Sequence, residues 1–317
     1  MSERTIKLFI HALLSEENKK FLRGRLPAGA TAVFLDELTG PARREEFARA
    51  DYAYGNPPAD WLEGEDIRLQ WVQLYSAGFS EYQQLGRSIP VSNLHGFFAR
   101  PCAETLVGGI LAIYRKIDEL TLLKSRKEWI GSALRPRMKL LHGKKVILLG
   151  TGTIALAIRE ILVGFRCELS LYGRTHPEAR FRTKQELLAA LPEADILINT
   201  LPGTVKTKGF VSADLLQAMH PDAIVANIGR GSTVDEPALL RALQERRIGG
   251  AVLDVYAQEP LPVDSPLWNC PNVILTQHTG GGSAEEERGK ISFFLENLSR
   301  VLAGDKPLNL VDLRRGY

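Results

Sequence analysis

The first hundred residues alternate between short apolar runs and segments in which apolar side chains recur at helical spacing. The apolar runs predict three strands, at Ile6–Ile10, Ala32–Leu35 and Leu69–Leu74. The segments between them predict short helices at Glu16–Leu22 and Ala42–Ala50. Strands and helices that alternate in this way are typical of a small parallel sheet covered by helices. The pattern therefore predicts an α/β domain at the start of the chain.

A longer and more regular alternation follows. Apolar residues at helical spacing predict a long helix over residues 103–117, and a Lys- and Arg-rich connection leads from it to Lys144. Apolar runs beyond this connection predict six strands, at Val146–Leu149, Glu168–Tyr172, Ile196–Thr200, Ala223–Asn227, Gly250–Val255 and Val273–Thr276. A last helix is predicted at Ala284–Leu302. Six apolar strands joined by helices are typical of a doubly wound parallel sheet that is buried on both faces.

Composition narrows the possibilities further. At 317 residues the chain exceeds the size at which one hydrophobic core usually stops growing, so two domains are expected. A net charge of +3 gives no reason to expect a nucleic-acid partner. Three widely separated cysteines offer neither a disulfide framework nor a CxxC metal site, which favours a reducing compartment. No apolar run approaches the length of a membrane span, and the N-terminal residues suit a strand better than a signal peptide. These features predict a cytoplasmic protein without a metal site or membrane contact.

A glycine-rich turn lies between the predicted strand Lys145–Leu149 and a predicted helix at Thr153–Leu162. In such a turn the first glycine allows a tight bend, the second lets the backbone approach a pyrophosphate, and a small third residue lets helix and strand pack closely. The start of the helix then offers free N–H groups to the phosphates. The sequence therefore predicts a dinucleotide-binding turn formed by Gly150, Thr151, Gly152, Thr153, Ile154 and Ala155.

The next predicted strand carries information on the cofactor. An NAD site typically has a carboxylate at the end of this strand, but here the strand ends in Gly173-Arg174-Thr175. A guanidinium can pair with the extra phosphate of NADP, and a threonine hydroxyl can donate a hydrogen bond to it. We therefore expect NADP to be preferred over NAD. The alternative is that Arg174 stacks on the adenine of NAD.

Three further strand ends carry residues suited to chemistry. The first is Asn227-Ile-Gly-Arg230-Gly231, the second is Asp254-Val-Tyr-Ala-Gln-Glu259-Pro260, and the third is Thr276-Gln-His278-Thr-Gly-Gly281. Ligands of open α/β sheets bind beyond the carboxyl ends of the strands, so all three segments are expected to face one crevice.

Taken together, these segments resemble the D-isomer-specific 2-hydroxyacid dehydrogenases. The resemblance covers nearly the whole chain, most strongly residues 141–281, and its motifs agree in order and spacing. It also includes Leu201-Pro202, Thr207, Trp129, Leu141-His-Gly143, Ser265-Pro-Leu-Trp268 and Asn309-Leu-Val-Asp312. Two departures are Ala155, where a third glycine is more usual, and Gln277, where the family often has proline.

The resemblance implies a fold and an assembly. A Rossmann-type doubly wound sheet, at residues 100–283, would bind the dinucleotide. A smaller flavodoxin-like α/β substrate domain would be built from both chain ends, residues 1–99 and 284–317. The active site would lie in the cleft between them, and hinge closure would exclude water. A homodimer formed through the cofactor domains is expected by the same analogy.

The resemblance also implies roles for individual residues. Reduction of a 2-oxo acid needs a cation for the carboxylate, which Arg230 can supply while it polarises the carbonyl. His278 is the expected acid/base, and Glu259 would orient its ring and favour its protonated form. The backbone of Ser76, Ala77 and Gly78 would help to bind the substrate carboxylate, and Asp254 would receive the nicotinamide carboxamide, although both segments can also be read as ordinary turns. The other residues expected at the cofactor are Thr200, Leu201, Pro202, Thr207, Ile228, Gly229 and Gly280, with Arg230 and His278 contacting both ligands.

Within this family the sequence best fits a reductase of glyoxylate or hydroxypyruvate, D-specific and dependent on NADP(H). Formate, phosphoglycerate and phosphite dehydrogenases are alternatives within the family. A dinucleotide-sensing scaffold of the corepressor type is the alternative from another functional class. A small 2-oxo acid is thus the expected partner, and its side chain is left open by the sequence.

Overall fold

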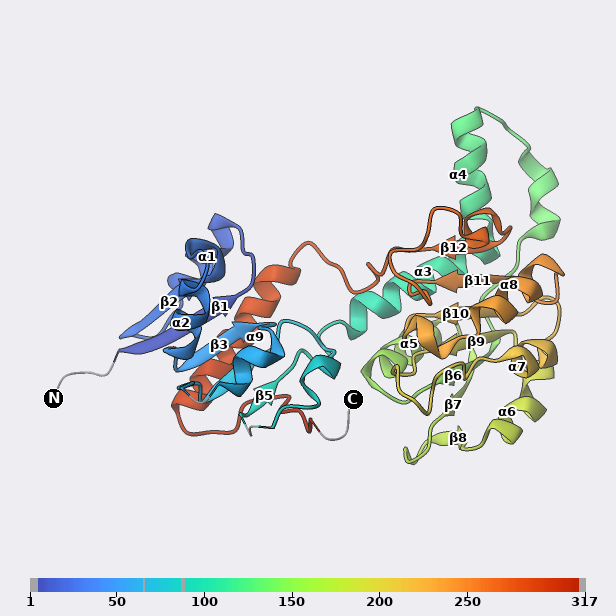
Figure 1. The fold of residues 1–317 in the computed structure, drawn as a ribbon. Coiled ribbons are helices and arrows are strands. Elements are labelled where there is room, and N and C mark those ends of the chain that lie inside the picture. Colours follow the sequence, from blue (N-terminus) through green and yellow to red (C-terminus); the bar gives the residue numbers. More distant parts are fainter. Residues whose placement is uncertain (1–4, 65, 87–88, 314–317) are drawn as a thin grey trace. The chain divides into compact units, whose positions relative to one another are not determined.

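The computed structural model describes residues 5–64, 66–86 and 89–313. The chain divides into two compact units (Figure 1). Unit 1 contains Met1–Phe97 and Ser283–Tyr317, so it takes residues from both parts of the chain that flank unit 2. Unit 2 is the continuous stretch Phe98–Gly282.

Unit 1 is built on a five-stranded parallel sheet in the order β2-β1-β3-β4-β5. The strands are β1 (Ile6–His11), β2 (Ala30–Phe34), β3 (Tyr52–Gly55), β4 (Trp71–Gln73) and β5 (Val91–Ser92), and the helices are α1 (Glu16–Arg23), α2 (Ala42–Ala48) and α9 (Glu286–Leu302). The aromatic ring of Phe294 in α9 stacks on Tyr54 at 4.8 Å and on Trp71 at 6.0 Å between ring centroids. The late helix α9 therefore completes the core of a sheet formed by the first hundred residues.

Unit 2 is built on a seven-stranded parallel sheet in the order β12-β11-β10-β9-β6-β7-β8. Its strands are β6 (Lys145–Leu149), β7 (Glu168–Tyr172), β8 (Ala179–Phe181), β9 (Ile196–Asn199), β10 (Ile224–Asn227), β11 (Gly250–Leu253) and β12 (Val273–Leu275). Ile147 and Leu149 of β6 join one hydrophobic core, whereas Val146 and Leu148 join the other. Both faces of the sheet are therefore buried, as the run of apolar residues predicts, and the predicted fold class is confirmed.

Helices cover the two faces of this sheet. The helices α3 (Ala99–Arg115) and α5 (Thr153–Gly164) pack in one core, and α6 (Lys184–Ala190), α7 (Ala213–Ala218) and α8 (Glu236–Gln244) pack in the other. This places the crossover helices on both sides of a parallel sheet, the arrangement of a doubly wound fold. No helix in the described ranges is long and apolar enough to span a membrane.

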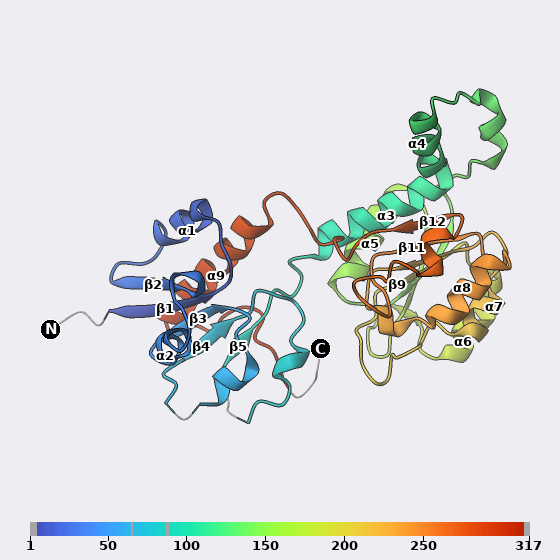
Figure 2. The same cartoon turned by 45° about the horizontal axis from the view of Figure 1, so that its top comes forward.

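The segment between α3 and β6 differs from the prediction. The predicted helix over residues 103–117 ends at Arg115, because Lys116 adopts a left-handed backbone conformation with φ of 56°. A second helix, α4 (Ile117–Arg126), and a 3-10 turn at Gly131–Arg137 then occupy the stretch that was predicted to be a loose connection. Within unit 2, α4 and the turn project away from the sheet in both views (Figures 1 and 2).

Candidate active site

The predicted phosphate-binding turn follows β6 directly. Gly150 has a φ of 113°, and a Cβ atom there would lie only 2.5 Å from Oγ1 of Thr200, so a side chain is excluded on two grounds. At Gly152, by contrast, an added Cβ would meet nothing within 4 Å. The helix α5 begins immediately after Gly152, and Ala155 in its first turn is completely buried. Open space in front of free helix N–H groups fits a pyrophosphate.

The end of β7 lies against this turn. The N–H of Gly150 donates to the carbonyl of Tyr172 at 2.9 Å, and a Cβ at Gly173 would come within 2.5 Å of Cγ2 of Thr151. Arg174 and Thr175, which follow, are exposed. The backbone on either side of Thr175 is held by Arg182, whose guanidinium donates to the carbonyl oxygens of Arg174 at 3.1 Å and His176 at 3.2 Å. The sequence reasoning missed Arg182, because it follows the short strand β8, which was not predicted.

The segment after β9 connects the glycine turn to the Arg230 turn. Oγ1 of Thr200 donates to the carbonyl of Leu149 at 2.9 Å. Oγ1 of Thr207 donates to the carbonyl of Pro202 at 2.5 Å and so closes the turn between them. A Cβ at Gly229 would lie 2.6 Å from the carbonyl oxygen of Leu201, so the two backbones are in direct contact. The predicted cofactor segments of β6, β9 and β10 are therefore adjacent in unit 2.

The Arg230 turn follows β10. Ile228 and Gly229 are buried, and the side chain of Arg230 is exposed, with Nη1 donating to the carbonyl of Gly229 at 2.7 Å. A Cβ at Gly231 would lie 1.7 Å from the carbonyl oxygen of Tyr256, so this turn rests directly on the segment that leads to Glu259. Arg230 also acts electrostatically on Cys102, where its positive charge partly opposes the rise in pKa that burial causes.

Glu259 and His278 form a hydrogen-bonded pair. Oε2 of Glu259 lies 2.6 Å from Nδ1 of His278, and Oε1 accepts a hydrogen bond from the N–H of Tyr256 at 2.9 Å. Both carboxylate oxygens are therefore engaged, one by the backbone and one by the imidazole. Because Nδ1 is bound to Glu259, Nε2 is the ring nitrogen that remains to face a ligand. Half of the His278 side chain is exposed, so a ligand can reach it.

The loop that carries His278 is held by Asp254. This buried carboxylate accepts hydrogen bonds at Oδ1 from Thr276 Oγ1 at 2.5 Å, from the N–H of Thr279 at 3.1 Å and from the N–H of Gly280 at 3.0 Å. The N–H of His278 donates to the carbonyl of Asp254 at 2.8 Å, and His278 itself has a φ of 53°. The carboxylate thus stabilises a left-handed conformation that is uncommon for residues other than glycine. The sequence reasoning missed this structural role of Asp254.

The Ser76–Gly78 loop of unit 1 has its carbonyl oxygens occupied. The carbonyls of Ser76, Ala77 and Gly78 accept hydrogen bonds from Leu94 N–H at 3.0 Å, Asn93 Nδ2 at 2.6 Å and Ser76 Oγ at 2.7 Å. No described residue accepts a hydrogen bond from the N–H of Ala77 or Gly78. The loop can therefore present these two N–H groups to an anion.

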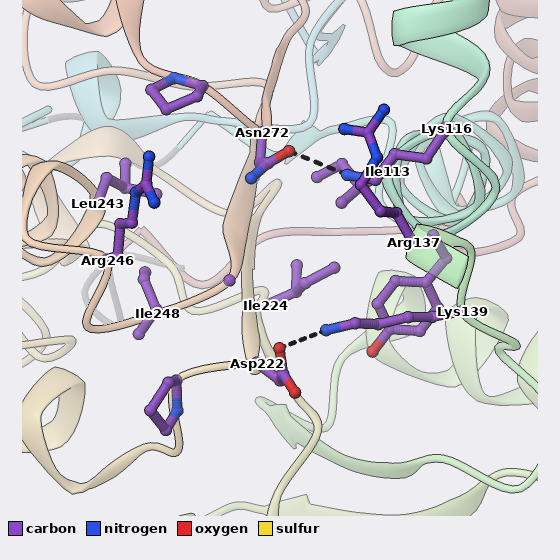
Figure 3. A pocket seen from close by; sticks show the side chains of 14 residues that line it. Ile113, Lys116, Arg137, Lys139, Asp222, Ile224, Leu243, Arg246, Ile248 and Asn272 are labelled. Carbon is purple, nitrogen blue, oxygen red and sulfur yellow. Dashed lines mark hydrogen bonds and ion pairs between the residues drawn. The ribbon is translucent and has the colours of Figure 1, made fainter. Parts of the chain in front are cut away.

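A separate cavity of about 380 Å³ lies where strands of the unit 2 sheet begin, away from the strand ends that carry the predicted site residues (Figure 3). It is lined by residues at the amino ends of β10, β11 and β12, whereas the predicted site residues follow the carboxyl ends. Two of its lysines are held by side chains across the cavity, Lys116 by Asn272 at 3.0 Å and Lys139 by Asp222 at 2.6 Å. This cavity is therefore distinct from the cluster of predicted site residues.

Comparison with known proteins decides the family. Residues 107–280 match the model of the D-isomer specific 2-hydroxyacid dehydrogenase NAD binding domain. The chain belongs to the D-isomer-specific 2-hydroxyacid dehydrogenases. It is 33% identical to a glyoxylate/hydroxypyruvate reductase B of Enterobacter agglomerans over 308 residues, which cover 92% of this chain and 94% of that protein.

Solved structures of this dehydrogenase family have the same fold. A family member from Aeromonas salmonicida subsp. salmonicida A449 superposes with a TM-score of 0.84 at 25% identity, covering 98% of this chain and 99% of the other. A D-isomer specific 2-hydroxyacid dehydrogenase from Xanthobacter autotrophicus Py2, in complex with NADPH and MES, gives a TM-score of 0.79 at 26% identity, covering 99% and 100%. The predicted family, fold class and enzyme class are confirmed: the dehydrogenase acts on CH–OH donors and uses a nicotinamide dinucleotide.

Proposed function

We propose that this dehydrogenase reduces small 2-oxo acids to D-2-hydroxy acids with NADPH, as a glyoxylate/hydroxypyruvate reductase. The observation that carries the proposal is the Glu259–His278 hydrogen bond of 2.6 Å, held by the Tyr256 N–H and adjacent to the Arg230 turn. An imidazole fixed by a carboxylate supplies the proton that the reaction needs, and a neighbouring guanidinium suits an acid substrate. In this proposal unit 2 carries the dinucleotide domain and unit 1 the substrate domain.

The proton transfer follows from the way the pair is held. Glu259 fixes the ring through Nδ1, so the imidazolium donates its Nε2 proton to the carbonyl oxygen of the substrate. The carbonyl carbon receives a hydride, which the reduced nicotinamide supplies when it is bound. The products are a 2-hydroxy acid and neutral His278, which regains a proton from water. In the oxidative direction neutral Nε2 accepts the hydroxyl proton.

The substrate carboxylate is proposed to bind two kinds of donor. Arg230 offers an exposed guanidinium in the turn after β10, and its charge also polarises the substrate carbonyl next to the carboxylate. Ala77 and Gly78 offer backbone N–H groups that no described residue engages. Asp254 is proposed to receive the nicotinamide carboxamide at Oδ2, since the three hydrogen bonds to the 276–280 loop all use Oδ1.

The preference for NADP is proposed from the end of β7. Arg174 and Thr175 are exposed beside the glycine turn, and the strand end carries no carboxylate that would repel a phosphate. We expect kcat/KM with NADPH to exceed that with NADH, and Arg174→Asp to reverse the order. Arg166→Asp makes the same charge change at the other end of β7 and should leave the order unchanged. Equal use of both cofactors by the wild type would contradict this assignment.

A homodimer is proposed from the exposed apolar side chains of the segment over residues 117–140. Trp129 is 94% exposed, and Ile117, Leu122 and Leu140 are each more than half exposed. In unit 2 this segment projects from the sheet (Figure 1), and a second copy related by twofold symmetry would cover the same segment on both chains. Light scattering should give a dimer for the wild type and a monomer for Trp129→Glu. Val263→Glu, at an equally exposed site outside the segment, should stay dimeric.

A cytoplasmic location is proposed from cysteine chemistry. Cys102, Cys167 and Cys270 are all free thiols in the structure, and unpaired thiols persist in reducing compartments. Fractionation of the native cell, with the enzyme activity as the marker, tests this location.

The function is tested by following the absorbance of reduced nicotinamide with a panel of 2-oxo acids. Glyoxylate and hydroxypyruvate are expected to be reduced faster than 2-oxo acids with bulky side chains. His278→Ala should lower kcat by about two to four orders of magnitude, as loss of a general acid does. His220→Ala, a histidine before the amino end of β10, should have little effect. Turnover of formate, phosphoglycerate or phosphite, or binding of NADPH without any turnover, would contradict the proposal and favour the alternatives.

A further inference from the structure

Three polar side chains are completely buried where β9 and β10 end. Asn199, Asn227 and Thr233 have no more than 1% of their surface exposed; Asn199 and Asn227 end β9 and β10, and Thr233 lies in the turn that follows β10. A buried amide or hydroxyl is costly unless each donor and acceptor is hydrogen-bonded. The hydrogen-bond partners of these three side chains therefore show which segments the buried polar groups hold in place.

One side of this network holds the cofactor segment. Oδ1 of Asn199 accepts a hydrogen bond from the N–H of Leu201 at 3.2 Å. The two hydrogens of its Nδ2 go to Oδ1 of Asn227 at 2.9 Å and Oγ1 of Thr233 at 2.6 Å. Asn199 thus connects the backbone beyond β9 to the two side chains beyond β10.

The other side of the network holds the Arg230 turn. Oδ1 of Asn227 accepts from the N–H of Gly229 at 3.1 Å, and its Nδ2 donates to the carbonyl of Arg230 at 3.3 Å. Oγ1 of Thr233 donates its single hydrogen to the same carbonyl at 2.5 Å, and the N–H of Thr233 also donates to it at 3.2 Å. Three donors therefore converge on one carbonyl oxygen, and the donors and acceptors of the network are mutually consistent.

We infer that Asn199, Asn227 and Thr233 are positioning residues for the 2-oxo acid. They set the backbone of Arg230 relative to the segment at Leu201, so that a guanidinium on a loop is presented in one orientation. Apolar residues could fill the same volume, but they would leave the Arg230 carbonyl and the N–H groups of Leu201 and Gly229 without these partners. Among the described residues, the Arg230 guanidinium has one hydrogen-bond partner, the carbonyl of Gly229 in the same turn, so its orientation depends on this backbone.

The inference rests on the proposed function, and the matched pair Thr233→Val and Thr233→Ser tests it. Valine keeps the shape of threonine and removes the hydroxyl, whereas serine keeps the hydroxyl and removes the methyl group. Loss of a hydrogen bond typically corresponds to about a tenfold change in an equilibrium constant. We expect Thr233→Val to raise KM for glyoxylate about tenfold, and Thr233→Ser to stay within about threefold of the wild type.

A double-variant cycle separates positioning from packing. If Thr233 acts through Arg230, Thr233→Val should change KM much less in an Arg230→Lys background, because lysine cannot use the guanidinium geometry that the turn presents. Equal KM values for the valine and serine variants, or the same loss in both backgrounds, would overturn the positioning role. If Thr233→Val does not fold, Thr233→Ala replaces it with the same criteria. A wild-type enzyme that reduces no 2-oxo acid would instead refute the proposed function.

Discussion

Replacing Gly231 by alanine perturbs the contact on which the candidate site depends. The added Cβ would lie 1.7 Å from the carbonyl oxygen of Tyr256 and 2.0 Å from its carbonyl carbon, both of them backbone atoms. Real Cβ contacts essentially never fall under 3.0 Å, so the two segments must separate by at least 1.3 Å. One segment carries Arg230, and the other is hydrogen-bonded to Glu259. A misplacement of about 1 Å in a catalytic site can lower the rate about 100-fold.

We therefore expect Gly231→Ala to lower kcat/KM for glyoxylate about 100-fold, while overpacking lowers the free energy of unfolding by about 1–3 kcal/mol. Steady-state kinetics and urea denaturation measure the two effects. Gly108→Ala is the matched control, because a Cβ in this part of α3 meets nothing within 4 Å. It should leave kcat/KM unchanged and stabilise the helix by up to about 1 kcal/mol. A Gly231→Ala enzyme within threefold of the wild type would refute the reasoning.

Three further changes probe other parts of the molecule. Asp254→Ala removes the three hydrogen bonds to the 276–280 loop, so amide hydrogen exchange in that loop should accelerate and kcat should fall. Unchanged exchange would contradict the role of Asp254 in holding the loop. Burial, and secondarily the charge of Asp254, raises the pKa of the Cys102 thiol to about 11. At about pH 8, iodoacetamide should therefore modify Cys102 more slowly than the less buried Cys270, which mass spectrometry can measure. Burial and the charge of Arg43 lower the pKa of His11 below its ordinary 6.5, so the unfolded state binds the proton more readily. Stability should therefore fall as pH drops through 6.5 towards the folded pKa, and fall less in His11→Gln, as measured by urea denaturation at each pH.

The sequence predicted the strands that show as runs of Val, Ile and Leu residues. It missed β3, although all four of its residues are buried, because Tyr52-Ala-Tyr-Gly55 is too short and too mixed to form such a run. β9 and β10 are apolar up to their last residue because helices cover both faces, and apolar runs predict such strands well. β8 was missed because Arg180 is exposed in the middle of only three residues. β5 was missed because two residues carry no pattern, and its pairing includes a bridge to Leu310, far along the chain. The break at Lys116 is a single backbone conformation that hydrophobic periodicity does not report.

Residues of the candidate site could be predicted where their type is uncommon in that sequence context. Glycines before a helix, and a histidine in a glycine-rich strand-end loop, are unusual enough to stand out. The residues that hold the site did not stand out, because their effect depends on partners distant in the sequence. Asn199 shares hydrogen bonds with Thr233, 34 residues later, and Arg182 holds a loop through carbonyl oxygens that any residue has. A polar residue that ends an apolar strand, as Asn199 ends β9, is the signal that would have found this network.

The composition of unit 1 from two separated stretches has a consequence for synthesis on the ribosome. Asn297 donates to Gln73 at 2.8 Å across 224 positions of sequence, and Phe294 supplies an aromatic layer beneath Tyr54 and Trp71. Unit 2 needs no residue beyond Gly282, so it can reach its native fold while the emerging chain still lacks α9. The aromatic face of the five-stranded sheet stays uncovered until α9 has been translated. Nascent chains should therefore bind chaperones through the sheet that is made first and finished last.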